Sequence, residues 1–256
     1  MKSVKKIIVG NWKMNPTAVV EAVKIAKILA KNYPPLKNVM PVICPPAVFL
    51  DPVKKELKTK KSILLGGQDA YMEPEGSFTG AVSAKMLKSV GAAYVILGHS
   101  EARYRGDTNE MVNTKIKTAI KAGLTPIVCV GEDARDESGA YLQFISTQLT
   151  ETLKDIPKPA FKSMIIAYEP VWAIGKNAPR AATTAEALEI VIHIKRFLSD
   201  LLGKGSEVVP ILYGASVDPK NAGTFLKEAG VNGLLVGRDS LDPKKFVEIL
   251  KIAEKI

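Results

Sequence analysis

Short apolar runs alternate with longer amphipathic stretches along almost the whole chain. Each run holds three to five residues and ends at or close to a glycine, a proline or a polar residue, which is typical of a strand buried on both faces. We therefore expect eight strands, at Ile7–Gly10, Pro41–Cys44, Ser62–Leu65, Ala93–Leu97, Pro126–Val130, Ile165–Ala167, Val209–Leu212 and Leu234–Val236.

Helix-start signals follow most of these runs. A helix is expected after Pro16-Thr17, with Val20, Val23, Ala26 and Ile28 facing the core among lysines. Three Asp-Pro pairs place a capping aspartate before a proline at the first helical position, at Asp51-Pro52, Asp218-Pro219 and Asp242-Pro243. Asp107–Glu110 and Thr183–Glu186 have the pattern of a capping box.

Buried strands that alternate with helices indicate a parallel sheet covered by those helices. No Ser- or Gly-rich linker divides the 256 residues, and roughly 250 residues is the usual size of an eight-fold barrel. The predicted fold is therefore α/β, a single closed (β/α)8 barrel domain over residues 1–256. An open doubly wound sheet is the alternative, but no Gly-x-Gly-x-x-Gly turn follows the first run.

The composition is that of an ordinary globular protein, with 46% hydrophobic and 24% charged residues. No apolar run approaches the roughly 20 residues that cross a bilayer, and the start of the chain is too short in apolar residues for a signal peptide. We expect a cytoplasmic soluble protein with no membrane partner.

The net charge of +10 lies in the first 61 residues, which hold 13 lysines against three acidic residues. The remaining residues carry 23 basic and 23 acidic groups, which cancel. The lysines have helical spacing and lack interleaved arginines or aromatics. A solvated helix face that helps attract an anionic substrate is therefore favoured over a nucleic-acid surface.

Cysteine and histidine positions give no sign of a metal site. Cys44 and Cys129 lie inside apolar runs, so we expect buried free thiols rather than a disulfide. His99 and His193 are the two histidines and lie far apart in the sequence. His193 falls in a helical pattern, where a hydrogen-bonded core histidine is the expected interpretation.

The segment Tyr168-Glu169-Pro170-Val171-Trp172-Ala173-Ile174-Gly175 is the most informative one for chemistry. Glu169 stands at the mouth of an apolar strand, where partial desolvation would raise its pKa and make it a better base near neutral pH. A lone strand-end glutamate could equally pair with a lysine. Pro-Val-Trp and a short apolar tip follow, however, and this is the pattern of a lid that closes over a site.

Lys13 and His99 stand at the ends of two other predicted strands, where a barrel carries its reactive groups. Lys13 could be a solvated lysine, and His99 could be a core histidine bonded to a carbonyl. The residues Ser100-Glu101 resemble a helix start directed at the site and favour a functional His99. A cation, an imidazole and a carboxylate in one pocket suit proton abstraction beside a carbonyl.

Four stretches resemble the triosephosphate isomerase family, in that family's order along the chain. They are Asn11–Asn15, Gly98–Glu101, Tyr168–Gly175 and, with one change, Tyr213–Val217. The resemblance implies a TIM barrel that interconverts dihydroxyacetone phosphate and glyceraldehyde 3-phosphate without a metal or organic cofactor. It implies Glu169 as base, His99 as neutral electrophile and Lys13 as electrostatic anchor, which is the established arrangement in this family.

The same resemblance implies a phosphate site. It would consist of backbone amides of Gly175, Ser216, Gly237 and Arg238, and Asn11, Trp12 and Lys13 are further expected substrate-binding residues. Four positions depart from the family, because Arg238 and Ala215 replace glycines and Lys176-Asn177 replace a Thr-Gly hinge. Either the backbone at Arg238 is regular or some strain is accepted there. Asn177 is expected to absorb the dihedral change at the end of the lid.

The stretch Gly76-Ser77-Phe78-Thr79-Gly80 resembles the arm that family members insert into a partner subunit. An aromatic at the tip of a loop supports a homodimer, although the loop could instead pack on its own barrel. Ala81 and Ala102 replace a glutamate and an arginine of the family, so that both charges are lost together.

Two further functions fit parts of the sequence. A barrel isomerase acting on a larger aminated sugar phosphate is disfavoured by the lid motif after Glu169. A barrel that only binds a ligand or a protein is suggested by Arg238 and by the altered hinge, but Lys13, His99 and Glu169 are all present.

Overall fold

The eight apolar runs form eight parallel strands in the computed structural model, which describes residues 5–58, 60, 62–175 and 178–256. The strands are β1 (Lys6–Asn11), β2 (Val39–Cys44), β3 (Leu64–Gly67), β4 (Tyr94–Leu97), β5 (Thr125–Val130), β6 (Ile165–Tyr168), β7 (Ile211–Tyr213) and β8 (Gly233–Val236). Each pairs with the next in sequence, and β1 also pairs with β8, so the sheet closes on itself.

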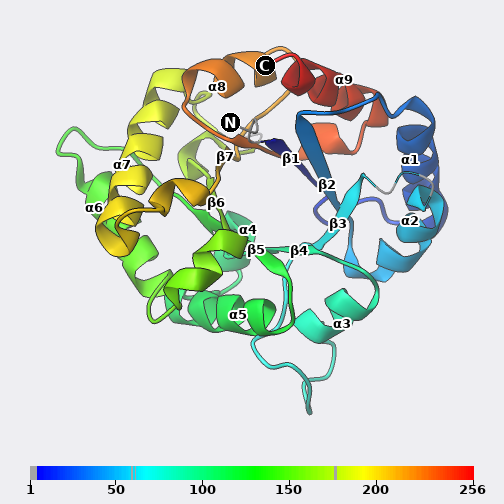
Figure 1. Cartoon of the computed structure of the whole chain (residues 1–256), viewed down its shortest axis with the longest axis horizontal. Helices are drawn as coiled ribbons and strands as arrows, with labels where there is room; N and C mark the ends of the chain where they lie inside the picture. Colours follow the sequence, from blue (N-terminus) through cyan, green and yellow to red (C-terminus); the bar gives the residue numbers. More distant parts are fainter. Residues whose placement is uncertain (1–4, 59, 61, 176–177) are drawn as a thin grey trace.

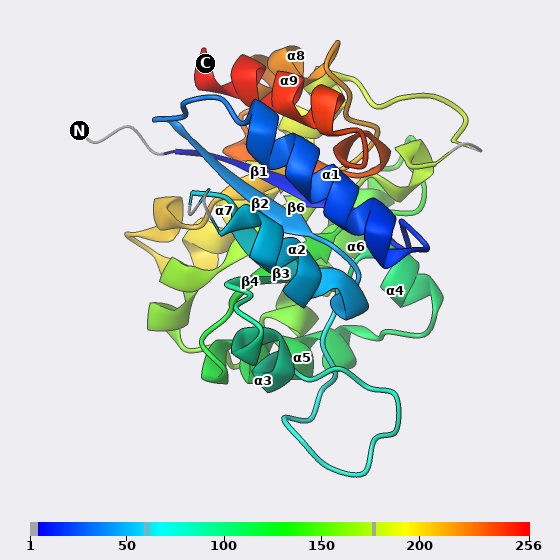
Figure 2. The same ribbon diagram turned by 90° about the vertical axis from the view of Figure 1, so that its right-hand side faces the viewer.

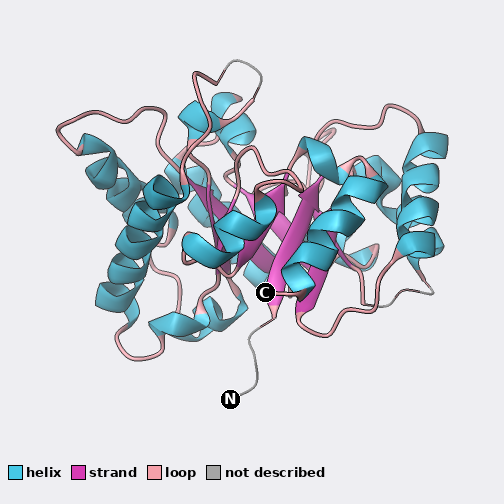
Figure 3. Ribbon diagram, turned by 90° about the horizontal axis from the view of Figure 1, so that it is seen from above, coloured by secondary structure: helices cyan, strands magenta, loops and turns pink. Residues whose placement is uncertain are grey.

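Helices surround the strands on the outside of this barrel (Figures 1 and 3). They are α1 (Val19–Asn32), α2 (Leu50–Leu57), α3 (Ala84–Ser89), α4 (Ser100–Tyr104), α5 (Asn109–Lys121), α6 (Ala140–Thr152), α7 (Thr184–Leu202), α8 (Ala222–Glu228) and α9 (Pro243–Glu254). Short 3-10 turns follow several strands, at η1 (Ala47–Phe49), η3 (Val171–Ala173) and η5 (Arg238–Ser240), and others lie at η2 (Lys158–Ser163) and η4 (Ser206–Val208). The predicted (β/α)8 barrel is confirmed.

Alternating strand residues build two separate apolar cores, because successive side chains of a strand point to opposite faces. Ile8 and Ile43 belong to the large core between the sheet and the helices, whereas Val9 and Val42 belong to a smaller core inside the barrel. Cys44 and Cys129 lie in the inner core as free, buried thiols, as predicted. Burial raises the pKa of the Cys44 thiol, which keeps it protonated.

Two strands are shifted along the chain from their predicted positions. Strand β3 begins at Leu64, two residues later than predicted, and continues through two glycines that the apolar pattern excluded. Its register is set by its neighbours, since Leu64 pairs with Val42 and Gly66 pairs with Tyr94. Strand β7 likewise begins at Ile211, after Pro210, which has no N–H to donate to a ladder.

Helix starts agree with the predictions where the capping side chain meets free backbone N–H groups. Thr183 and Glu186 form a complete capping box at the start of α7. Asp242 caps α9 by accepting from the N–H groups of Lys244 and Lys245.

The predicted starts at Asp51-Pro52 and Asp218-Pro219 were wrong, whereas α5 begins within Asp107–Glu110 as predicted but without the predicted capping box. Thr108 alone caps α5, while Asp107 turns away to pair with Lys115 at 2.7 Å. Helix α2 begins at Leu50, so Asp51 lies inside its first turn. Asp218 accepts from two backbone N–H groups in a turn, and α8 begins only at Ala222.

The buried face of α1 also differs from the prediction. Ala22, Ala26 and Leu29 are buried, at helical spacing of four and three residues. Val20 was predicted to face the core but is 69% exposed, because it lies two residues before Ala22, about 200° around the helix, and so on the opposite face.

Candidate functional site

Three sequence-predicted chemical residues stand just beyond strand ends on the same rim of the barrel. Lys13 follows β1 by two residues, His99 follows β4 by two, and Glu169 directly follows β6. Because all eight strands are parallel, these ends meet at one edge, which is where barrels carry their sites.

Glu169 is held in a buried position against the start of α4. Its side chain is 2% exposed, one carboxylate oxygen accepts the backbone N–H of Ser100 at 3.0 Å, and the other lies 3.3 Å from Nε2 of His99. The backbone of Glu169 passes so close to Gly131 that a β-carbon there would lie 1.7 Å from its carbonyl oxygen. Glycine at position 131 is therefore required for this approach.

The hydrogen bonds of His99 define its tautomer. Nδ1 accepts the backbone N–H of Glu101 at 3.1 Å, so Nδ1 carries no proton and the ring is neutral with its proton on Nε2. The alternative of a core histidine bonded to a carbonyl is not what this geometry shows. His99 presents its Nε2–H towards Glu169 and is itself almost fully buried.

Lys13 adopts a backbone conformation that is unusual for a residue with a side chain. Its φ is 54°, and its N–H donates to Oδ1 of Asn11 at 3.0 Å. Its ammonium group pairs with Glu101 at 2.6 Å. Burial alone would raise the pKa of Glu101, but the hydrogen bond and charge of Lys13 outweigh it and lower that pKa. The pair joins the ends of β1 and β4 across the rim.

A cavity of about 600 Å³ opens beside these groups. All seven sequence-predicted binding residues line it, namely Asn11, Trp12, Lys13, Gly175, Ser216, Gly237 and Arg238. Further lining residues are Asn15, Glu101, Ile174, Ala215, Val217, Asp218, Asp239, Leu241 and Lys245. His99 and Glu169 are not part of this lining. They lie behind it, where a β-carbon on Gly214 would be 3.3 Å from Cγ of Glu169.

The backbone at the replaced glycines is regular. Among the described residues, the non-glycine residues with positive φ are Lys13 and Asp155, so Arg238 and Ala215 occupy ordinary conformations. Of the two alternatives for Arg238, the unstrained one is correct. Lys176 and Asn177, the predicted hinge, lie outside the described residues.

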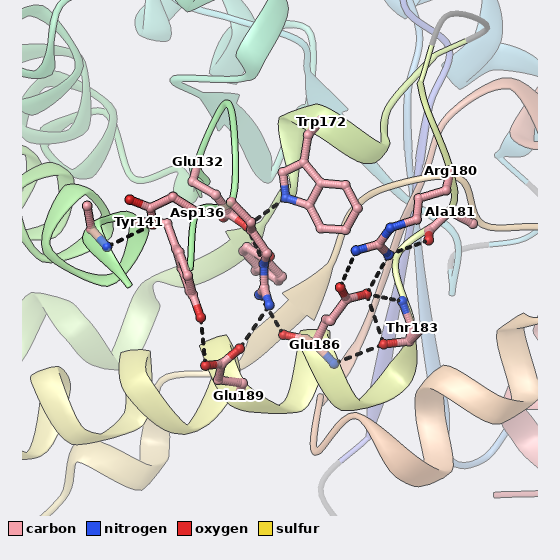
Figure 4. Close-up of polar contacts among 12 residues, drawn as sticks. Glu132, Asp136, Tyr141, Trp172, Arg180, Ala181, Thr183, Glu186 and Glu189 are labelled. Atoms are coloured by element: carbon pink, nitrogen blue, oxygen red, sulfur yellow. Dashed lines mark hydrogen bonds and ion pairs between the residues drawn. The ribbon is translucent and has the colours of Figure 1, made fainter. Parts of the chain in front are cut away.

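The sequence did not identify Glu132 as part of the site, although it follows β5 by two residues, as Lys13 follows β1 and His99 follows β4. It is 1% exposed, and one of its oxygens accepts from the Tyr168 hydroxyl at 2.9 Å, the Trp172 indole at 2.8 Å and the Arg135 guanidinium at 3.1 Å (Figure 4). Burial and the charge of Glu132 raise the pKa of Tyr168, so this hydroxyl remains a donor.

Arg180 packs against the ring of Trp172, whose indole N–H is bonded to Glu132. Its guanidinium carbon lies 4.6 Å from the centroid of a Trp172 ring, and the same group pairs with Glu186 of the α7 capping box (Figure 4). The hydrogen bond from Arg180 is the main reason that the pKa of Glu186 falls to about 2. The start of the segment after Glu169 is thus anchored to both β5 and α7.

Metal and membrane features are absent from the described parts of the chain. No group of three or more His, Cys, Asp or Glu side chains there could hold a metal ion, and no helix there is long and apolar enough to cross a membrane. His193 is half-buried rather than buried, and its Nε2 contacts the Ser146 hydroxyl at 2.8 Å.

Comparisons with known proteins cover nearly the whole chain. The family model described as triosephosphate isomerase matches residues 6–253. A triosephosphate isomerase of Dehalococcoides mccartyi is 43% identical over 98% of this chain and 97% of its own length, and one of Endomicrobium trichonymphae is 39% identical over 98% and 99%. The crystal structure of triosephosphate isomerase from Bartonella henselae superposes with a TM-score of 0.85 at 35% identity, covering 97% of this chain and 99% of that one.

Proposed function

The chain belongs to the triosephosphate isomerase family, and from this premise we propose that Glu169, His99 and Lys13 carry its reaction. It is an isomerase of glycolysis and gluconeogenesis that interconverts dihydroxyacetone phosphate and D-glyceraldehyde 3-phosphate through an enediol(ate). The observation that carries the residue assignment is the 3.3 Å approach of the Glu169 carboxylate to Nε2 of His99, behind a cavity lined by Lys13.

In the proposed mechanism, Glu169 removes a proton from the carbon next to the substrate carbonyl and later returns it to the neighbouring carbon. His99 donates its Nε2–H to the carbonyl oxygen, and the Lys13 ammonium stabilises the negative charge that develops there. The neutral tautomer of His99 supports this role, because its Nε2 already carries the proton to be donated.

Glu169 has to leave its resting contact before it can act. Its carboxylate is bonded to the Ser100 N–H and is almost fully buried, so a bound substrate has to draw it towards the cavity. Pro170 and Trp172 follow it directly, and closure of this segment would couple movement of the base to exclusion of water.

The phosphate end of the substrate is assigned to the opposite part of the cavity, at Gly175, Ser216, Gly237 and Arg238, with Asn11 and Trp12 beside Lys13. Ser216 is held there by its hydroxyl, which donates to the Ala173 carbonyl at 3.1 Å. This arrangement supports binding of a phosphorylated triose with its carbonyl end towards Glu169.

A coupled assay on the purified chain tests the function. D-glyceraldehyde 3-phosphate is supplied, and formation of dihydroxyacetone phosphate is followed through its reduction by a second enzyme. We expect saturable turnover that a metal chelator leaves unchanged. Turnover only of a larger aminated sugar phosphate would indicate a different isomerase, and phosphate binding without any turnover would indicate a barrel that only binds.

We also propose that the chain forms a homodimer through the arm, defined here as the loop of residues 68–83 between β3 and α3. The arm projects away from the barrel (Figures 1 and 2). Its base is fixed, because Asp69 pairs with the buried Lys115 at 3.0 Å and Tyr71 forms a β-bridge with Ser83. Phe78 at its tip packs against Tyr71, with the two rings tilted and their centroids 4.7 Å apart, yet it is still 41% exposed.

Several large apolar side chains that follow strand ends are exposed in the single chain. Met14 is 89% exposed, Val48 77% and Tyr104 92%, and they follow β1, β2 and β4, on the rim where the arm begins after β3. Apolar groups gathered on one side of a protein support a protein partner, and a second copy of this chain would present the same surface. Sedimentation at micromolar concentration tests this, and a monomeric mass would rule out the dimer.

A further inference from the structure

We propose that the guanidinium group of Arg238 binds the substrate phosphate directly, in addition to the backbone amides assigned to that end of the cavity. The proposal rests on the proposed function and deepens it, because it names a side chain that recognises the phosphate dianion.

Most charged side chains that line the cavity already form ion pairs or hydrogen bonds within the protein. Lys13 pairs with Glu101 at 2.6 Å, and Lys245 pairs with Asp239 at 3.1 Å. The carboxylate of Asp218 accepts the backbone N–H groups of the two residues that begin its turn, at 2.8 and 2.9 Å. These groups largely neutralise one another.

Arg238 is the exception among these lining residues. In the part of the chain that the structure describes, no ion pair or side-chain hydrogen bond involves its guanidinium, and Arg238 is an exposed residue of the cavity lining. An arginine fork with no carboxylate partner presents parallel N–H donors that match two oxygens of a phosphate. A phosphate dianion at this end can therefore bind Arg238 without displacing an existing ion pair.

The position of Arg238 also fits a triose phosphate. The neighbouring Gly237 packs under the Lys13 side chain, since a β-carbon there would lie 3.6 Å from Cε of Lys13. Arg238 directly follows Gly237, so its backbone lies next to this point of the wall, and the Lys13 ammonium is directed towards Glu101.

This placement predicts which kinetic constant depends on Arg238. The phosphate does not change charge during the reaction, so its contact with Arg238 has the same strength in the ground state and in the transition state. Loss of the contact should raise KM and leave kcat unchanged. The effect should weaken as salt is added, because the guanidinium is exposed.

The experiment compares Arg238→Gln and Arg238→Lys with the wild type. Binding of inorganic phosphate is measured by calorimetry at low ionic strength, and KM and kcat by the coupled assay. We expect Arg238→Gln to weaken phosphate binding and raise KM by about 3- to 10-fold, as for a partly exposed charge-assisted contact. Arg238→Lys keeps the charge but loses the forked pair of donors, so its phosphate affinity and KM should lie between those of the wild type and those of Arg238→Gln.

Lys244→Gln is the matched control. Lys244 is an exposed cation on α9 that does not line the cavity, and its loss changes the net charge equally. Both constants should remain close to wild type in this variant. If Lys244→Gln weakened phosphate binding and raised KM as much as Arg238→Gln, the effect would come from the overall positive charge of the protein and not from a direct contact with Arg238. That result would overturn the proposal.

Two other outcomes would also overturn it, namely unchanged phosphate binding in Arg238→Gln, or a fall in kcat with KM unaltered. The phosphate measurement keeps this inference separate from the proposed function. A wild type without isomerase activity whose phosphate binding still depends on Arg238 would contradict the function alone, whereas an active wild type with Arg238-independent phosphate binding would contradict only this inference.

Discussion

The hydrogen bond of the His99 Nδ1 determines how this ring can act in the proposed reaction. Nδ1 accepts the N–H of Glu101 at the start of α4, and this bond fixes both the ring orientation and the tautomer. The same turn places the N–H of Ser100 against the Glu169 carboxylate. A single tight turn after β4 therefore positions the proposed electrophile and holds the proposed base.

The first prediction concerns Glu169. Glu169→Gln keeps the size of the side chain and an oxygen that can accept the Ser100 N–H, so the fold should be retained, but the proton acceptor is lost. Turnover should fall by at least ~10²-fold, the lower end of what a positioned base supplies.

The measurement is kcat for the purified variant, with a thermal melt to show that it is folded. Glu248→Gln, at an exposed glutamate of α9, serves as the control and should turn over like wild type. Near wild-type turnover in Glu169→Gln would remove this residue from the proposed role.

At the scale of elements, the start of α7 is the most strongly capped helix end that we observe. Thr183 and Glu186 form reciprocal hydrogen bonds, and Arg180 adds an ion pair to the Glu186 carboxylate and a cation–π contact to Trp172. A helix of the outer layer is thereby tied to the segment that follows Glu169.

Glu186 should make stability depend on pH in a defined window. Its folded-state pKa of about 2 lies below its ordinary value of 4.5, so its contribution is complete above pH 4.5 and is lost as the pH falls towards 2. Glu186→Gln should lower the free energy of unfolding at pH 7 by about 1 kcal/mol, the usual size of a cap or an exposed ion pair.

Urea unfolding of wild type and variant between pH 7 and pH 3 measures this difference. The gap between the two proteins should be constant down to about pH 4.5 and then narrow. Glu248→Gln should show no such change, and a gap that widens as the pH falls would contradict the assignment.

At the scale of the whole molecule, the barrel leaves one projecting arm and a set of exposed apolar groups near the same rim. Lys115 of α5 is 4% exposed and forms ion pairs with both Asp69 and Asp107. These ion pairs connect the base of the arm to α5. Burial raises the pKa of Asp69, and the neighbouring Lys115 opposes this rise. A rigid base with an exposed aromatic tip is suited to insertion into a partner subunit.

Phe78→Asp tests this arrangement. A charge placed in the proposed interface would lack a partner, and the dimer dissociation constant should rise by about 30-fold or more, the effect of losing one central interface residue. Phe144→Asp is a matched control on α6, because Phe144 is 43% exposed and Phe78 is 41% exposed.

Sedimentation of both variants at several concentrations shows whether the arm forms the dimer interface. The Phe144 variant should remain dimeric while the Phe78 variant dissociates. If both behave alike, the arm has no special role in assembly.

The sequence alone determined the order of the eight strands, the closed barrel and the identity of the residues at the strand ends. Short apolar runs predict these strands, because an apolar run is buried in the fold whichever strands pack beside it. Lys13, His99 and Glu169 were identified because each stands two or three residues after such a run. The predicted caps at Thr183–Glu186 and Asp242-Pro243 were correct, because all of their partners lie within four residues of the cap.

Only the tertiary structure decided the contacts between strand ends. Lys13 pairs with Glu101 across 88 residues, and Ser100 donates to Glu169 across 69. The register of β3, the tautomer of His99 and the three bonds to Glu132 likewise depend on neighbours from other strands. The geometry of these contacts is fixed only when the barrel closes and brings distant strand ends to one rim, so no local pattern along the chain can encode it.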